Sequence, residues 1–267
     1  MSMFRASRHS AAVSTLALAA ALSATAADAA NVAALIDGNK IAIVDTDAKK
    51  PTSMVDIAGV KLVGIDVRPA DKMLYGLTAE GAVVTIDWKT GKTTAKSQLS
   101  EKLPAGAMFA VDFNPAADRL RVIGSDGTSL RINVDDGKTM VDGRLKFAET
   151  DAMKGQTAKV AAAAYTNSVA GTKETTLYDI DWNSGALVKQ APPNDGILNT
   201  VGKLGVKLDG GGAFDISTDA EGKNWAWLMD GTTLYSVELA NGAAKAAAEI
   251  AGIKGQVQDI AMLPAMS

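Results

Sequence analysis

Residues 64–69 read GIDVRP, and a related stretch, VDFNP, follows at residues 111–115. In both, an Asp lies among apolar residues and a Pro follows three positions later. Each is succeeded by short apolar segments separated by turns that contain Gly. Asp66 and Asp112 are 46 residues apart, and ~40 to 50 residues is the usual length of a propeller blade of four short strands. The repeat therefore predicts a β-propeller.

Two more divergent units continue the pattern, with AAYTN at residues 163–167 and AFDI at residues 213–216. Period-two alternation, β-branched and aromatic residues, and Gly, Asn or Asp at the breaks support strands throughout. The Ala-rich stretches 160–164 and 243–248 would favour helix by propensity alone. Because they fall at strand positions of the repeat, we predict strands there.

The two ends of the chain complement each other. Residues 258–264, QDIAMLP, form a first strand with nothing after it, whereas residues 32–36, 40–45 and 52–57 form three strands that lack a first one. Pairing them completes a blade and leaves no free sheet edge. We therefore predict an all-β propeller of five blades, each of four antiparallel strands, closed by the C-terminal strand; six blades is the alternative.

The N-terminus has the features of a secretory signal. Arg5 and Arg8 precede an apolar stretch at residues 11–26, and small residues follow at possible cleavage sites. The stretch is shorter than the ~20 residues that span a bilayer, although a retained anchor is the alternative. We predict a signal peptide over residues 1–29 and one domain over residues 30–267, in the periplasm or outside the cell.

The residue types that remain restrict the chemistry. The chain has no Cys, and its one His, His9, lies in the predicted signal. Ser-His-Asp and Cys-His catalysis, zinc sites built on His or Cys, and haem held by these residues are thus excluded from the mature protein. The sequence predicts no cofactor, no metal site and no catalytic residue.

The charge balance and hydropathy restrict the partners. Without the signal, 25 basic and 29 acidic residues remain, with no basic stripe of the kind that binds nucleic acid. No later apolar run is long enough to span a membrane. We expect a monomer that binds neither nucleic acid nor membrane, and whose partner is a small ligand or another protein.

Several motifs together resemble a known family. They are residues 64–87, 112–115 (DFNP), 118–122 (DRLRV), 163–167 (AAYTN) and 192–196 (PPNDG). Their order resembles that of the bacterial domain-of-unknown-function family 4394, over nearly the whole mature chain. The resemblance implies an exported domain with propeller-like repeats, and it implies no activity or catalytic residue.

Residues that break the repeat are the candidates for a binding site. Arg119, Arg121 and Arg131 are unusual, and Arg121 and Arg131 should be cross-strand neighbours if residues 125–127 form a hairpin loop. Because like charges directly opposite each other are destabilising, an acid or a bound anion should lie beside them. Pairing with Asp112, Asp118 or Asp126 is one interpretation, and an anion-binding patch is the other.

A second departure from the repeat is the loop at residues 191–196, APPNDG, which includes Asn194 and Asp195. Tyr165 and Asn167 lie upstream in the same unit. Loops on a rigid scaffold often carry binding sites, but Pro, Asn, Asp and Gly are also ordinary turn residues. We include these four residues as candidate ligand-binding residues.

Two further groups have structural interpretations. Trp225 and Trp227 should face the same side of one strand and contribute to packing, or else stack on a sugar ring. A residue type that recurs in every repeat serves structure. The first-strand aspartates are therefore expected to bond neighbouring backbone, with a cation-binding carboxylate ring as the alternative; they are Asp66, Asp112, Asp215 and Asp259.

From these observations the sequence favours an exported, non-catalytic binding or scaffold propeller, with an anionic small molecule or a protein as its partner. The alternative is an extracytoplasmic hydrolase or lyase that uses carboxylates or Arg and Tyr. A glycosidase needs two carboxyl groups about 5 to 9.5 Å apart. A sequence with acids in nearly every turn does not identify such a pair.

Overall fold

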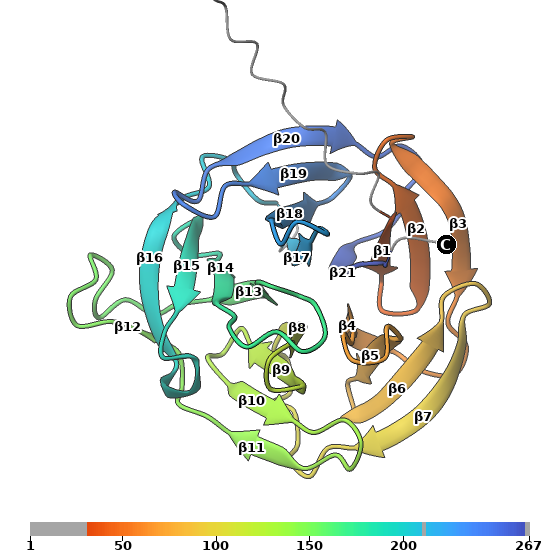
Figure 1. The fold of residues 1–267 in the computed structure, drawn as a ribbon, viewed down its shortest axis with the longest axis horizontal. Coiled ribbons are helices and arrows are strands. Elements are labelled where there is room, and N and C mark those ends of the chain that lie inside the picture. The colour runs from red at the N-terminus through yellow and green to blue at the C-terminus, as the bar shows by residue number, and fades with distance from the viewer. Residues whose placement is uncertain (1–30, 210–211, 265–267) are drawn as a thin grey trace, which may run out of the picture.

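The computed structural model describes residues 31–209 and 212–264, which form a ring of five small β-sheets, or blades (Figure 1). In each blade the strands follow one another from the axis of the ring to its outer surface. The prediction of an all-β, five-bladed propeller is therefore confirmed. Within the described ranges, no helix is long and apolar enough to cross a membrane.

The strands divide among the blades as follows. Blade 1 contains β21 (Val257–Met262), β1 (Asn31–Ile36), β2 (Lys40–Asp45) and β3 (Lys50–Asp56). Blade 2 contains β4 (Leu62–Val67), β5 (Leu74–Thr78), β6 (Ala82–Asp87) and β7 (Lys92–Gln98). Blade 3 contains β8 (Phe109–Asn114), β9 (Arg119–Gly124), β10 (Ser129–Ile132) and β11 (Thr139–Val141). Blade 4 contains β13 (Val160–Tyr165), β14 (Leu177–Asp181), β15 (Ala186–Gln190), β16 (Ile197–Lys203) and β12 (Lys146–Phe147). Blade 5 contains β17 (Ala213–Thr218), β18 (Asn224–Asp230), β19 (Thr233–Val237) and β20 (Ala244–Glu249).

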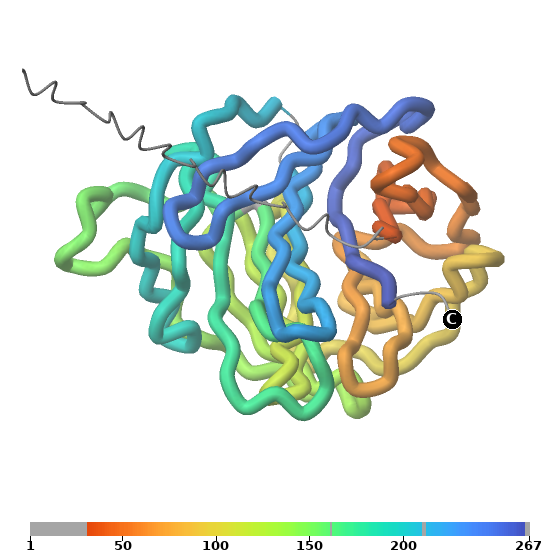
Figure 2. The backbone as a smooth tube through the Cα atoms, turned by 45° about the horizontal axis from the view of Figure 1, so that its top comes forward, coloured from red at the N-terminus to blue at the C-terminus, as the bar shows by residue number. Residues whose placement is uncertain are grey.

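The C-terminal strand closes the ring, as the sequence predicts. Strand β21 pairs antiparallel with β1, with Ala33 opposite Ala261 and Leu35 opposite Asp259. In Figure 2 the blue C-terminal strand lies beside the red N-terminal one. Blade 1 is thus assembled from both ends of the chain, and the inner edge of β1 is not left unpaired.

Blade 4 differs from the prediction of four strands per blade because it has a fifth, β12. After β11 the chain crosses to the next blade, where Lys146 and Phe147 pair in parallel with Ile197 and Leu198 of β16. The short strand covers the outer edge of β16, an edge that would otherwise present unpaired backbone groups.

The hydrophobic core lies between adjacent blades. On β8 and β9, Val111 and Val122 pack toward blade 2, whereas Ala110 and Ile123 pack toward blade 4. Alternating side chains of each inner strand therefore belong to different inter-blade layers, as the pleat of a strand requires. This explains why the inner strands are buried on both faces.

The Ala-rich stretches form strands β13 and β20, despite their helix propensity. Ala162 packs toward blade 5 and Ala163 toward blade 3. At the axis the innermost strands lie closest together, so small side chains fit on both faces of β13. Tertiary packing overrides local propensity here.

Candidate functional site

Backbone hydrogen bonds to aspartates join the innermost strands of neighbouring blades. Each carboxylate accepts a bond from a backbone N–H of the next blade. The pairs are Asp259 with Ile65 at 2.9 Å, Asp66 with Phe113 at 2.6 Å, Asp112 with Tyr165 at 3.0 Å and Asp215 with Met262 at 2.6 Å. The structural interpretation of the four aspartates is therefore correct: they link blades 1 to 2, 2 to 3, 3 to 4 and 5 to 1.

The position of Asp259 corrects the predicted repeat. Asp66 bonds the residue after Asp112, whereas Asp215 bonds Met262, three residues after Asp259. Ala261 therefore occupies the position equivalent to Asp112, and Asp259 lies two residues earlier on its strand. The 44-residue spacing between Asp215 and Asp259 is not a true repeat distance.

The junction of blades 4 and 5 uses different groups, because Ala164 occupies the aspartate position on β13. Asn167 N donates to Asn224 Oδ1 at 2.8 Å, and Asn224 Nδ2 donates back to Asn167 Oδ1 at 2.9 Å. Ser168 N donates to Thr218 Oγ1 at 2.8 Å. Asn167, a residue predicted to bind ligand, thus anchors the loop after β13 to blade 5.

Three of the axial carboxylates lie close together. Asp66, Asp112 and Asp215 each place a carboxylate oxygen within 4.8 Å of the other two, and all three residues are buried. Burial raises the pKa of Asp66 and of Asp112 well above the ordinary range, with repulsion from neighbouring carboxylates acting in the same direction. Burial also raises the pKa of Asp215, to about 6. Carboxylate oxygens are the ligands that hard cations such as Ca²⁺ prefer.

A pocket of about 400 Å³ opens at the rim of the ring where the innermost strands end. Asp66 and Asp215 contribute its acidic groups, and Lys72, Ser168, Ser217 and Thr218 its other polar ones. The remaining lining residues are apolar: Val67, Pro69, Val169, Ala170, Ile216, Met262, Leu263 and Pro264. We call this the axial pocket.

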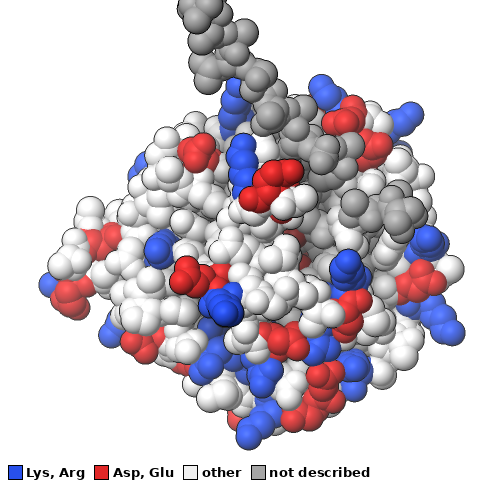
Figure 3. All heavy atoms as spheres, viewed as in Figure 1, with Lys and Arg blue, Asp and Glu red and all other residues white. Residues whose placement is uncertain are grey.

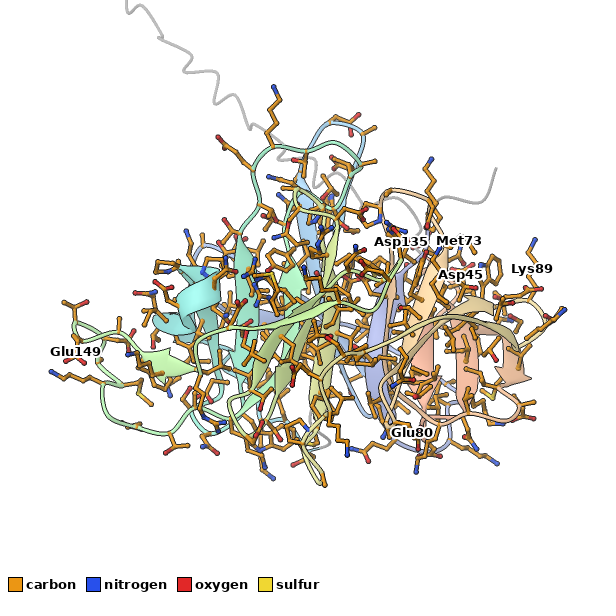
Figure 4. All side chains as sticks on the ribbon, turned by 90° about the horizontal axis from the view of Figure 1, so that it is seen from below. Asp45, Met73, Glu80, Lys89, Asp135 and Glu149 are labelled. Carbon is orange, nitrogen blue, oxygen red and sulfur yellow. The ribbon has the colours of Figure 1, made fainter. Side chains whose placement is uncertain are left out.

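The surface around the axis carries charges of both signs. In Figure 3 acidic and basic side chains are interspersed over the face shown in Figure 1, without one large patch of either sign. Figure 4 shows the ring from the side, with Met73 of the β4–β5 loop and Glu80 of the β5–β6 turn at opposite ends of blade 2. Met73 follows Lys72, which lines the axial pocket.

Arg68 fixes the rim next to the axial pocket, and the sequence analysis did not identify it. Its guanidinium donates to Asp118 at 2.6 and 2.8 Å and to Asp135 at 3.0 Å, so blade 2 is tied to two turns of blade 3. The bond to Asp118 raises the pKa of Arg68, and Arg68 in turn lowers the pKa of Asp135. Arg68 stands between Val67 and Pro69, which both line the pocket. The feature of the sequence that could have identified Arg68 is its place as a basic residue within the GIDVRP motif.

Four of the seven predicted ligand-binding residues meet in a buried network between blades 3 and 4. Arg121, whose side chain is only 1% exposed, donates to Tyr165 Oη at 3.1 Å and to Asn194 Oδ1 at 2.9 Å. It also bonds Asp142 at 2.5 Å, and Arg131 bonds both oxygens of the same carboxylate at 2.7 and 2.9 Å. The network lies apart from the residues that line the axial pocket.

Arg121 and Arg131 are cross-strand neighbours, and an acid lies between them, both as expected from the sequence. The acid is Asp142, and not one of the three that the sequence analysis named. Asp112 bonds backbone, Asp118 bonds Arg68, and Asp126 bonds Thr128. Asp142 was missed because it belongs to a segment outside the repeat pattern.

The other predicted residues lie elsewhere. Arg119 donates to the backbone oxygens of Ala117 and Asp118 at 3.3 and 2.8 Å. Asp195 belongs to the short 3-10 helix η1 (Pro193–Asp195) in the 191–196 loop. That loop is tied to the segment after β11, because Gly143 N donates to Asn194 O and Lys146 N to Gly196 O, both at 2.9 Å.

Trp225 and Trp227 face the same side of β18 and pack in the layer between blades 5 and 1. They also line a second pocket of about 390 Å³. The Lys223 ammonium lies 3.6 Å from the centre of the Trp225 ring, and Trp225 Nε1 donates to Asp219. One face of this indole is therefore covered by a side chain of the same blade.

The solved structures that the chain resembles share little sequence identity with it. A protein of unknown function from Bacteroides thetaiotaomicron VPI-5482 matches with a TM-score of 0.52 and 16% identity, over 87% of this chain and 70% of that one. Another of unknown function, from Bacteroides caccae, has a TM-score of 0.46 and 16% identity, over 85% and 76%. Glutaminyl cyclase from Myxococcus xanthus has a TM-score of 0.47 and 15% identity, over 72% and 77%.

The likeness to the first of these structures, at a TM-score of 0.52 and 16% identity, shows the fold alone. No curated protein matches the chain. The model of the family described as Domain of unknown function (DUF4394) matches residues 40–261, which is most of the chain, and the protein therefore belongs to this family.

Proposed function

We propose that this chain is an exported, non-catalytic binding module that takes a small ligand in the axial pocket. The observation that carries the proposal is the pocket itself. Its volume of about 400 Å³ falls within the ~300 to 1,000 Å³ typical of small-molecule sites. It also combines apolar walls with a few convergent polar groups, which is the usual composition of such sites.

The lining indicates the chemistry of the ligand. Asp66 and Asp215 present carboxyl groups, three hydroxyl side chains line the same pocket, and Lys72 is the one basic residue among the described residues of the lining. Such a lining favours a ligand that offers hydrogen-bond donors or positive charge to the carboxylates, with an apolar part against Val169 and Leu263. It does not favour the anionic ligand that the Arg residues suggested, because Arg121 is buried and bonded to Asp142.

A carboxylate-based hydrolase is the second candidate function. Asp66 and Asp215 are both in the pocket, and burial raises the pKa of each, as is often found for carboxyl groups in active sites. However, each already accepts two backbone N–H bonds, Asp66 from Val67 and Phe113 and Asp215 from Ile216 and Met262. Carboxylates that hold blades together in this way are poorly placed to exchange protons with a substrate, so we favour binding.

Export is part of the proposal and rests on the sequence. The basic residues, apolar stretch and small residues at positions 1–29 are typical of a secretory signal. These positions lie outside the described residues.

A pocket-filling variant tests the proposal. Ala170→Trp places an indole in the axial pocket, and Ala79→Trp is the matched control, because Ala79 is exposed in the β5–β6 turn at the opposite end of blade 2. Thermal unfolding of each protein would be followed with CaCl₂, butylamine, glucose and, as anions, phosphate and succinate. A ligand present at ~100 times its dissociation constant adds ~2.7 kcal/mol to stability.

We expect a cationic or hydroxyl-bearing probe to raise the melting temperature of the wild type and of Ala79→Trp, but not of Ala170→Trp. A shift that persists in Ala170→Trp would place binding elsewhere. A panel with no shift at all would contradict the small-ligand proposal. Hydrolysis of any compound in a panel of glycosides and esters by the wild type, and its loss in Asp66→Asn, would support the hydrolase instead.

A further inference from the structure

Asp179 is a buried carboxylate that the proposed function does not use. It lies on β14, is 0% exposed, and neither of its oxygens accepts a hydrogen bond from any described residue. On the same strand Leu177 packs toward blade 3 and Ile180 toward blade 5. Since side chains alternate along a strand, Asp179 faces blade 3 with Leu177. An ionised carboxylate without any donor would be very costly in such a place.

Gln190 is the second unpaired group on this face. It lies on β15 opposite Leu177, and Asp179 lies opposite Val188, so Asp179 and Gln190 are diagonal neighbours. Diagonal pairs on one face are ~7 to 8 Å apart at Cα, within reach of long side chains. Gln190 is 1% exposed, and its Oε1 has no donor among the described residues.

The orientation of the Gln190 amide follows from its other contact. Nε2 of Gln190 donates to the backbone oxygen of Pro193 in the 191–196 loop. A carbonyl oxygen only accepts, so the amide must present its NH₂ to Pro193. Its Oε1 is then left to accept a bond, and a protonated Asp179 is a donor of the right kind on the same face.

No described cation near Asp179 takes the place of a hydrogen-bond partner for its carboxyl group. Arg121, from β9 of blade 3, is the nearest cationic influence, but its guanidinium bonds Tyr165, Ser129, Asp142 and Asn194. Burial raises the pKa of Asp179 well above the ordinary range; Asp181, on the same strand, adds to the rise, and Arg121 opposes it. Other titratable or charged groups described between blades 3 and 4 include Asp112 on β8, Tyr165 on β13, Arg131 on β10, and Asp142 directly after β11.

We propose that native Asp179 is a neutral carboxylic acid that donates its proton to Gln190 Oε1, and that its ionisation loosens the 191–196 loop. The bond would hold Gln190 so that Nε2 stays on Pro193. Loss of the proton removes this bond and adds a negative charge near Arg121. Arg121 would then be drawn from Asn194 Oδ1, which is the second side-chain anchor of the loop. Asp179 is thus a pH-sensitive device between blades 3 and 4.

The first test compares the wild type with Asp179→Asn, whose amide can donate to Gln190 Oε1 without titrating. Urea unfolding would be measured from pH 5 to pH 9, with the exposed Asp136→Asn as a control. Between the unfolded-state pKa and the higher native pKa, the native protein holds one more proton, so stability falls as pH rises. The unfolding constant of the wild type relative to Asp179→Asn should therefore rise up to tenfold per pH unit. The axial aspartates contribute equally to both curves and cancel from the ratio.

The second test has a readout in the wild type itself. Amide exchange protection of Gly143 and Lys146, which bond the loop, should decrease in the wild type as the pH rises, and it should not decrease in Asp179→Asn. A constant ratio of unfolding constants at every pH would show that Asp179 is not the titrating group. If the ratio is constant and Asp179→Asn is also less stable than the wild type at every pH, Asp179 is ionised throughout this range and paired with Arg121. Either form of a constant ratio refutes the proposal. Unchanged loop protection would refute the coupling.

Discussion

Replacing Arg121 with methionine should destabilise the protein by ~3 kcal/mol. The side chain is 1% exposed, and its removal would leave acceptors at Tyr165, Asp142 and Asn194 without their buried donor. Breaking a buried ion pair by removing one member costs ~3 to 5 kcal/mol. Asp142 keeps its two bonds to Arg131, so the lower end of this range applies.

Urea unfolding at pH 7 measures the effect directly. Thermal unfolding is the second measurement. For a domain of this size, each kcal/mol of lost stability lowers the melting temperature by ~2 to 4 °C, so Arg121→Met should lower it by ~6 to 12 °C. Arg119→Met is the matched control, since Arg119 lies on the same strand and bonds only backbone oxygens. It should change stability by no more than ~0.5 kcal/mol. A loss below ~1 kcal/mol for Arg121→Met, or equal losses in the two variants, would refute the assignment of Arg121 as the centre of the network.

Two further predictions concern the axis of the ring. Because burial raises the pKa values of Asp66, Asp112, Asp215 and Asp259, the native protein holds protons that the unfolded chain has released. Stability should therefore be greatest near the unfolded Asp pKa of ~3.9, and it should fall as pH rises through about 6 and beyond; a denaturation series that rises with pH over this range would contradict the assignment. Gly64→Ala should cost ~1 to 3 kcal/mol, because the added Cβ would lie 2.3 Å from Val111 Cγ2 and 2.8 Å from Asp259 Oδ2. The loss caused by Gly64→Ala should be smaller in a Val111→Ala background, and an equal loss in the two backgrounds would exclude the clash with Val111 Cγ2.

The repeat was predictable because each blade must meet the same requirement. Every inner strand needs apolar residues on both faces and a group that links it to the next blade, so residues such as Asp66 and Asp112 recur at a fixed spacing. Closure was predictable for the same reason, since an unpaired strand at each end can be satisfied only by the other. The exception was Asp259, whose spacing from Asp215 resembles the period although its carboxylate lies two residues earlier on the strand.

The candidate site was much less accessible from the sequence. The axial pocket combines short segments of blades 1, 2, 4 and 5, among them residues 168–170, 215–218 and 262–264. Some of these residues belong to the repeat motifs, but those motifs indicate the fold and do not show that their ends meet around a pocket. Departures from the repeat led instead to Arg121, Tyr165 and Asn194, which meet in space but form a closed network with Asp142. An unusual charged residue signals a special environment, and the sequence alone does not distinguish a buried ion pair from a ligand site.

The pairing of β21 with β1 also determines when the molecule can fold. Strand β21 is the last part of the propeller to be synthesised, so blade 1 remains a three-stranded sheet with an exposed inner edge until residues 257–262 are available. The contacts that close the ring join positions at opposite ends of the chain, and such non-local contacts form slowly. The ring therefore cannot close before residues 257–262 have been synthesised, and until then the chain lacks the edge-to-edge pairing that completes blade 1.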